Sequence, residues 1–105
     1  MTGWQDVLSE VDQLVAVGSV SSEVGVNARS LLLALKADGQ EAPSIVVNAY
    51  MRSIEIFWDN RTPQFEVSES EYEVYWLFPD KSRIQHFSAT ETLRVVQLIK
   101  GPAPD

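Results

Sequence analysis

The residues most capable of chemistry in this chain are carboxylates crowded into its second half. They are Glu55, Asp59, Glu66, Glu69, Glu71 and Glu73. In a sheet of short antiparallel strands, Glu55, Glu66 and Glu73 are placed to become cross-strand neighbours on one face. Paired carboxylates share a proton or bind a hard cation such as Mg²⁺ or Ca²⁺. A solvated sheet face is the alternative. We favour it because no Asp-x-Asp-x-Asp-Gly calcium loop is present, and we predict no metal ligand and no cofactor.

Other catalytic groups are scarce. His86 is the single histidine, and its neighbours in sequence offer no partner at a diagnostic spacing to orient it as a base or ligand. We therefore interpret it as structural. The absence of cysteine excludes thiolate nucleophiles and cysteine-ligated zinc. The glycines stand singly, so no phosphate-binding loop is predicted. These observations favour a protein that is not an enzyme. A small enzyme using the carboxylates with a divalent metal remains an alternative.

The charge of the chain limits the partners that it can attract. There are 15 acidic and 8 basic residues, which give a net charge of −7. Nucleic acid and anionic lipid should be repelled, whereas a basic protein should be attracted. No segment approaches the roughly 20 apolar residues that cross a bilayer, and the N-terminus lacks the features of a signal peptide. We expect a cytoplasmic protein with a protein partner, and no nucleic-acid or membrane partner.

Aromatic residues alternate onto the same sheet face as the glutamates. Phe57, Tyr75 and Leu77 have this phase. Apolar anchors inside a polar rim are typical of protein-binding surfaces. Two other interpretations stay open: helices cover both faces of the sheet, or a bulge changes the register and these side chains enter the core. The predicted protein-binding residues are Glu55, Phe57, Asp59, Glu73 and Tyr75.

Hydrophobic periodicity predicts the elements that position these residues. Apolar residues at helical spacing predict helices over residues 4–17 and 23–37, ended by Gly18 and Gly39. Residues 1–39 should therefore form a helical hairpin, and after Pro43 the period changes to that of strands. Strands are expected over residues 44–49, 53–59, 64–68, 72–78 and 83–87, with a turn over residues 60–63.

The expected strands form one antiparallel meander over residues 44–87, with its last strand at an edge. A capping box, Ser88 to Glu91, predicts the start of a short C-terminal helix within residues 88–101. The helices and the antiparallel sheet are segregated along the chain. The sequence therefore predicts a single α+β domain over residues 1–105.

Three segments carry a resemblance: SIEIFWD at residues 53–59, QFEV at 64–67 and EVYW at 73–76. The chain resembles a class of small, uncharacterised bacterial α+β proteins with two N-terminal helices and an acidic, tryptophan-containing meander. The resemblance implies a small interaction protein and transfers no functional residue.

We therefore hypothesise a small acidic protein-binding module, such as an antitoxin, immunity or anti-defence inhibitor. One alternative is a structural or accessory subunit that forms a homodimer or larger homo-oligomer. The other is the carboxylate and divalent-metal enzyme.

Overall fold

The first two helices begin and end close to the predicted residues. The structure, a computed structural model, describes residues 3–59, 61–77 and 82–99. Helix α1 spans Trp4–Ala16 and helix α2 spans Ser22–Ala37. Gly18 and Gly39 follow them with φ of +77° and +85°, a left-handed conformation that costs glycine little. Ser21 caps α2, since its hydroxyl accepts a hydrogen bond from the Val24 backbone N–H at 3.3 Å.

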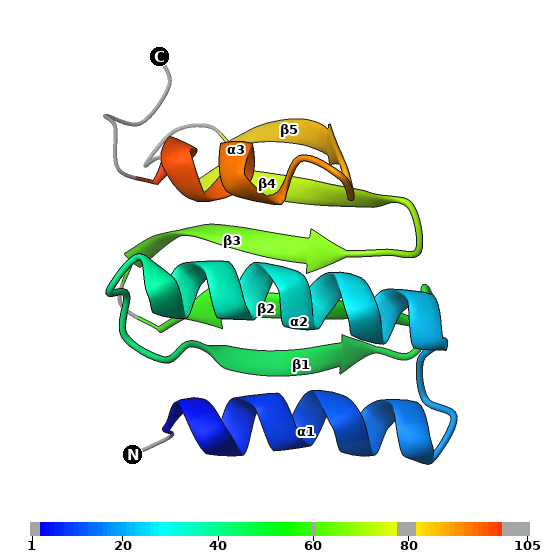
Figure 1. Cartoon of the computed structure of the whole chain (residues 1–105). Coiled ribbons are helices and arrows are strands. Elements are labelled where there is room, and N and C mark those ends of the chain that lie inside the picture. Colours follow the sequence, from blue (N-terminus) through cyan, green and yellow to red (C-terminus); the bar gives the residue numbers. More distant parts are fainter. Residues whose placement is uncertain (1–2, 60, 78–81, 100–105) are drawn as a thin grey trace.

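The strands form the predicted meander (Figure 1). They are β1 (Ser44–Asn48), β2 (Ser53–Trp58), β3 (Arg61–Val67), β4 (Glu71–Leu77) and β5 (Ser82–Ser88). Each strand pairs antiparallel with its neighbour in sequence, in the order β1-β2-β3-β4-β5. This confirms the α+β class and places β5 at an edge, as predicted.

The predicted turn over residues 60–63 is too long. β3 already begins at Arg61, so Pro63 lies inside a strand. The β2–β3 register is irregular between Ile56 and Trp58. A proline cannot donate to the ladder and is tolerated at such an irregularity. The bulge therefore allows pairing to continue past a proline that was predicted to lie in a turn.

The C-terminal helix begins later than predicted. α3 spans Thr92–Leu98, with Glu91 at its N-cap position, and residues 100–101 lie outside the described part of the chain. Glu91 Oε1 accepts a hydrogen bond from the Ser88 backbone N–H at 3.0 Å. The capping-box contact thus forms, but it closes a turn ahead of the helix. The reason is that Ser88 is still paired with Glu71 in the sheet.

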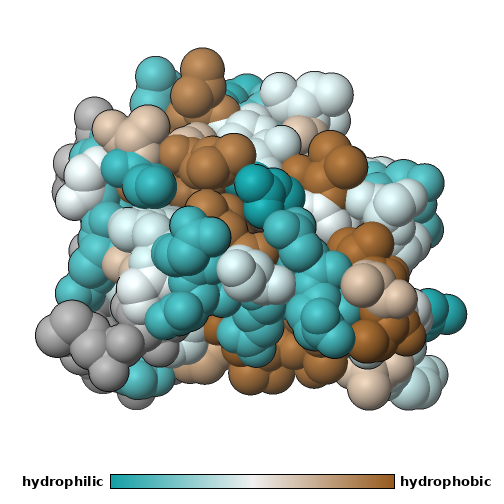
Figure 2. Space-filling model, turned by 60° about the horizontal axis from the view of Figure 1, so that its bottom comes forward, coloured by the Kyte–Doolittle hydropathy of each residue, from teal (hydrophilic) through white to brown (hydrophobic). Residues whose placement is uncertain are grey.

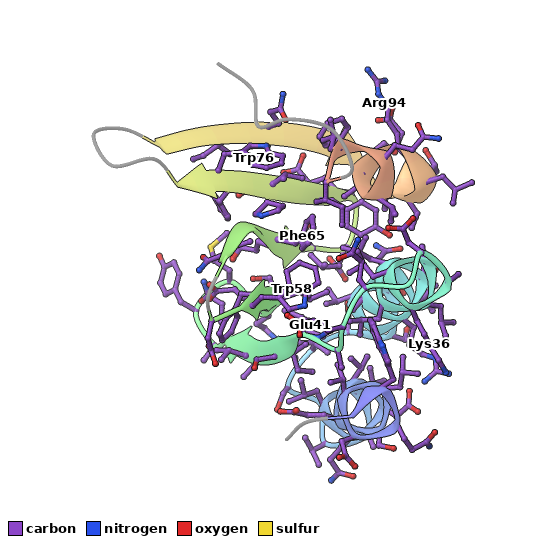
Figure 3. The ribbon with its side chains drawn as sticks, turned by 90° about the vertical axis from the view of Figure 1, so that its left-hand side faces the viewer. Lys36, Glu41, Trp58, Phe65, Trp76 and Arg94 are labelled. Atoms are coloured by element: carbon purple, nitrogen blue, oxygen red, sulfur yellow. The ribbon has the colours of Figure 1, made fainter. Side chains whose placement is uncertain are left out.

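All three helices lie against one face of the sheet, as the side view of the molecule shows (Figures 1 and 3). Alternate strand residues meet them in a common core with α1, α2 and α3. The strand residues buried in this core are Ile45, Ile54, Ile56, Trp58, Phe65, Val67, Tyr72, Val74 and Trp76. Trp58 and Phe65 contact edge to face with ring centroids 6.1 Å apart. No helix in the described residues is long and apolar enough to cross a membrane.

Polar groups attach the helices to this core. The Tyr72 hydroxyl donates to the Asn27 carbonyl of α2 at 3.0 Å and lies 2.9 Å from Thr92 Oγ1 of α3. The Trp58 indole N–H donates to the Glu41 carbonyl at 3.0 Å. Buried tyrosine and tryptophan need such partners. These bonds therefore hold α2, α3 and the link before β1 on the same side of the sheet.

The opposite face of the sheet is left without a helix among the described residues. The interpretation that the C-terminal helix covers this second face is wrong, because Val95 and Val96 of α3 are buried in the common core. Phe57 and Tyr75 are half-buried on the uncovered face. Neither is fully buried in the core, as Phe65 is. The side chain of Leu77 lies outside the described part.

Two phenylalanines in adjacent strands test which face is the core. Phe65→Ala should lower the free energy of unfolding by about 3–5 kcal/mol, because it opens a cavity among buried side chains. Phe57→Ala, the matched control on the uncovered face, should cost less than about 1.5 kcal/mol. Urea unfolding followed by tryptophan fluorescence measures both. Equal losses would contradict the one-sided core.

Candidate binding face of the sheet

A row of residues crosses all five strands on the uncovered face, which we call the open face. Register pairs Val46 with Glu55, Glu55 with Glu66, Glu66 with Glu73, and Glu73 with His86. Glu55, Glu66 and Glu73, here called the glutamate row, are thus direct cross-strand neighbours, as predicted. Directly opposed side chains lie about 5 Å apart at Cβ, and opposed like charges destabilise a sheet.

Glu66 has three hydrogen-bond contacts to its carboxylate. Its Oε2 accepts hydrogen bonds from Ser53 Oγ at 2.8 Å and from Asn48 Nδ2 at 3.3 Å, and its Oε1 accepts from the Tyr75 hydroxyl at 3.1 Å. Ser53 is buried, with 2% of its surface exposed, so its hydroxyl is shielded from solvent. Donors from β1, β2 and β4 therefore stabilise a carboxylate between two other glutamates.

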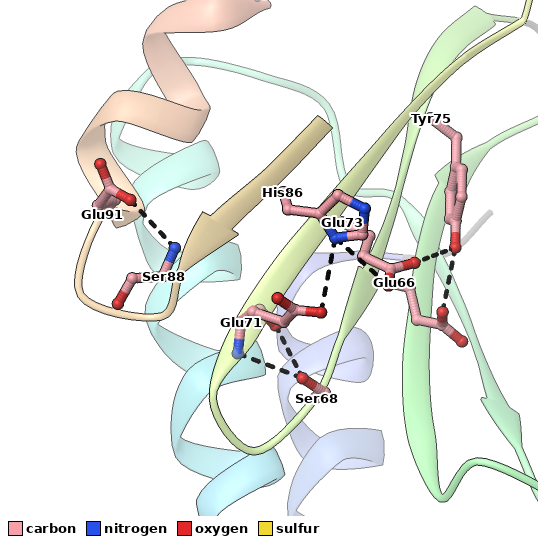
Figure 4. Close-up of polar contacts among 8 residues, drawn as sticks. All are labelled: Glu66, Ser68, Glu71, Glu73, Tyr75, His86, Ser88 and Glu91. Atoms are coloured by element: carbon pink, nitrogen blue, oxygen red, sulfur yellow. Dashed lines mark hydrogen bonds and ion pairs between the residues drawn. The ribbon is translucent and has the colours of Figure 1, made fainter. Parts of the chain in front are cut away.

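Tyr75 links Glu66 to Glu73, as Figure 4 shows. Its hydroxyl contacts Glu66 Oε1 and makes a short hydrogen bond to Glu73 Oε2. A phenol has one hydrogen and donates it to one acceptor at a time. Burial raises the pKa of Tyr75, and the hydrogen bond to Glu73 and the charges of Glu66 and Glu73 raise it further. The phenol therefore stays neutral and bridges the two carboxylates.

His86 has partners that its sequence neighbours do not reveal. Its Nδ1 lies 3.6 Å from Glu71 Oε1 and 3.6 Å from Glu73 Oε1. The sequence neighbours of His86 offered no partner, and the two carboxylates that face its imidazole come instead from β4, across the strand pair. The register of the β4–β5 hairpin, which sets Glu73 opposite His86, was the signal that could have found them.

A hollow of about 190 Å³ opens beside these groups. Its lining residues are Met51, Ser53, Glu66, Ser68, Glu71 and Glu73. Met51, Ser53 and Ser68 belong to no sequence motif and were not among the predicted site residues. They meet the glutamates only because the ends of β2, β3 and β4 lie together. The hollow thus combines three carboxylates, two hydroxyl-bearing side chains and one thioether.

Four of the five predicted binding residues lie together on the open face. Glu55 and Phe57 belong to β2, and Glu73 and Tyr75 belong to β4. Asp59 does not lie among them. It is exposed in the turn that follows β2, beyond the last paired residue of that strand. The structure thus supports the geometry of the predicted set except for Asp59, and the binding role itself stays a prediction.

The negative charge of the open face has no lysine or arginine beside it among the side chains that the structure describes. Arg29 pairs with Asp12 at 3.1 Å, and Arg94 pairs with Glu91 at 3.0 Å. Arg52 donates to the Gly18 carbonyl at 2.7 Å, and Lys36 is part of α2. The described cations thus belong to helices or to the turn before β2. An incoming cation would meet carboxylates that no described lysine or arginine neutralises.

Comparisons with known proteins give no relative. No protein family matches the sequence, no curated protein is significantly similar to it, and no solved structure matches it significantly. The function must therefore be argued from the chemistry of the open face.

Removing one charge from the glutamate row should stabilise the free protein. Glu55 is opposite Glu66 and has no hydrogen bond or ion pair in the described part of the chain. Glu55→Gln should raise the free energy of unfolding by about 0.2–1 kcal/mol, and added salt should reduce the gain. Urea unfolding measures this change, and Glu10→Gln, at an exposed position of α1, is the matched control. An unchanged or lower stability of Glu55→Gln would show that the row carries no repulsion.

Alkaline pH should destabilise the protein through two phenols, Tyr72 and Tyr75, whose pKa is raised in the folded state. The pKa of Tyr75 is raised, and burial also raises the pKa of Tyr72. Their contribution is complete below the unfolded tyrosine pKa of about 10 and is lost as pH rises above it. Tyr75→Phe should therefore lose less stability than the wild type between about pH 9 and about pH 12. Denaturation midpoints across this range measure the difference. Equal losses in both proteins would mean that Tyr75 does not contribute.

Proposed function

We propose that this protein is a non-enzymatic binding module whose open face engages a basic surface of a partner protein. The observation that carries the proposal is the glutamate row on a sheet face that no helix covers in residues 3–59, 61–77 and 82–99. An inhibitor of the antitoxin, immunity or anti-defence type is the member of this class that we favour.

The energetics of the row support a cationic partner. Glu55, Glu66 and Glu73 repel one another in the free protein. Lysine or arginine side chains of a partner would remove this repulsion on binding and would also steer the encounter. The charges thus lower the stability of the free protein while favouring the complex.

Apolar groups on the same face supply anchors. Phe57 and Tyr75 are half-buried, and Val46 and Ile84 are 46% and 52% exposed. Val46 is paired with Glu55, and Ile84 is paired with Tyr75. Anchors of this kind among charged groups match the composition of a protein interface. Figure 2 presents another side of the molecule, on which apolar side chains also lie in several groups with polar ones between them.

A second copy of the chain fits this face less well than a basic partner. Pairing two open faces would bring two glutamate rows together, and close like charges oppose association. The homo-oligomer is therefore the alternative outcome of the test below, recognisable by a mass that rises with protein concentration in light scattering.

A peptide-display library tests the proposal without knowledge of the natural partner. Random peptides selected on the immobilised protein should be enriched in lysine and arginine. Their binding should perturb the backbone NMR signals of β2, β3 and β4. Glu55→Lys should weaken binding of a selected peptide roughly tenfold or more, because close like charges at an interface are costly. The Phe57→Ala/Tyr75→Ala double variant should also weaken it by removing the anchors.

The matched control is Glu10→Lys, which makes the same charge change on α1 and should leave the affinity within about twofold at moderate salt. Selected peptides without basic residues, or perturbed signals confined to the helices, would contradict the proposal.

A further inference from the structure

The β4–β5 hairpin gathers three side chains with metal-binding atoms at one end of the open face. Glu71 and Glu73 are two residues apart in β4 and therefore share a face. His86 of β5 is directly opposite Glu73. One oxygen of each carboxylate and one imidazole nitrogen all lie within 4.8 Å of one another (Figure 4). We propose that Glu71, Glu73 and His86 bind a divalent transition-metal ion of the Zn²⁺ type.

The two distances from His86 to the carboxylates fit a shared ion better than direct hydrogen bonds. His86 Nδ1 is 3.6 Å from each carboxylate, beyond the roughly 2.7–3.2 Å of an N–H···O hydrogen bond. In a tetrahedral zinc site, bonds of about 2.0–2.2 Å place neighbouring ligand atoms roughly 3.3–3.6 Å apart. The imidazole therefore stands at nearly the ligand–ligand distance from two carboxylates at once.

A group outside the set holds the carboxylate of Glu73, and another holds the backbone that carries Glu71. Tyr75 donates to Oε2 of Glu73, while Oε1 of the same carboxylate faces His86. Ser68 Oγ accepts from the Glu71 backbone N–H at 3.2 Å and is also 3.2 Å from the Glu71 carbonyl oxygen, which fixes the tight turn that carries Glu71. Such outer contacts orient metal ligands. Tyr75 is thus a positioning residue for the site, and Ser68 fixes the backbone at Glu71.

The ligand types indicate the class of metal. One imidazole and two carboxylates suit first-row divalent ions such as Zn²⁺, whereas Mg²⁺ and Ca²⁺ prefer oxygen ligands alone. Three protein ligands leave a fourth position for water or another group. The His86 side chain is 58% exposed, so an ion can reach the site from solvent.

Isothermal titration calorimetry of the full chain with ZnCl₂, CoCl₂ and MgCl₂ tests the site. In the calorimeter we expect binding of one Zn²⁺ per chain and no heat with Mg²⁺. The absorption spectrum of the Co²⁺-loaded protein should be that of a tetrahedral site. Zn²⁺ should also raise the melting temperature, because it binds the folded state. His86 is the single histidine of the chain, so its ring NMR signals report directly on whether the imidazole binds the metal.

Matched variants separate this site from other acidic surface. His86→Ala, Glu71→Gln and Glu73→Gln should each weaken Zn²⁺ binding by at least the roughly 10- to 100-fold that loss of an outer contact costs. Tyr75→Phe should weaken it less than these, and Glu69→Gln, in the same turn, should leave it unchanged. No heat with Zn²⁺, or equal binding by His86→Ala, would overturn the proposal. Glu55→Lys should still bind Zn²⁺, so failure of the metal site and failure of the peptide-binding face are distinguishable.

Discussion

The structure depends on one constraint: the helices in the described part of the chain cover one face of the sheet and leave the other uncovered. Alternation in β2, β3 and β4 sends Ile54, Phe65 and Val74 into the core, and burial of these side chains provides the main driving force for folding. Tyr72 completes the arrangement by bonding to both α2 and α3. Alternation directs every second strand residue to the opposite face. Because α1, α2 and α3 pack into this core, that face must be stabilised in another way.

Hydrogen bonding stabilises that second face. Asn48 and Ser53 donate to Glu66, and the phenol of Tyr75 bridges Glu66 and Glu73, so that these contacts link β1, β2, β3 and β4. His86 continues the row into β5. The same network concentrates negative charge, and opposed glutamates weaken the sheet that carries them. Proteins accept such a local cost where a surface has a function, because optimal stability and activity often conflict. The balance of repulsion and hydrogen bonding is therefore the physical basis of the proposed role.

The two proposals use different ends of the open face. The basic-partner proposal rests on Glu55 and Phe57 of β2 together with the glutamate row, whereas the metal proposal rests on Glu71, Glu73 and His86 at the β4–β5 hairpin. Glu73 belongs to both and is oriented by Tyr75. A bound divalent ion would neutralise the Glu73 end of the row and leave Glu55 as its most negative part. The geometry thus connects the two sites through one tyrosine and one carboxylate.

The sequence by itself determined the elements, because periodicity and glycine stops are local: α1, α2 and the meander order follow from them. It also placed Glu55, Glu66 and Glu73 on one face, since strand alternation is local as well. Only the tertiary structure decided that α3 packs beside α2, that Pro63 lies within β3, and that His86 meets Glu71 and Glu73. These features depend on pairing register and helix docking. Both are set by contacts between residues distant in sequence, which no local pattern of one chain specifies.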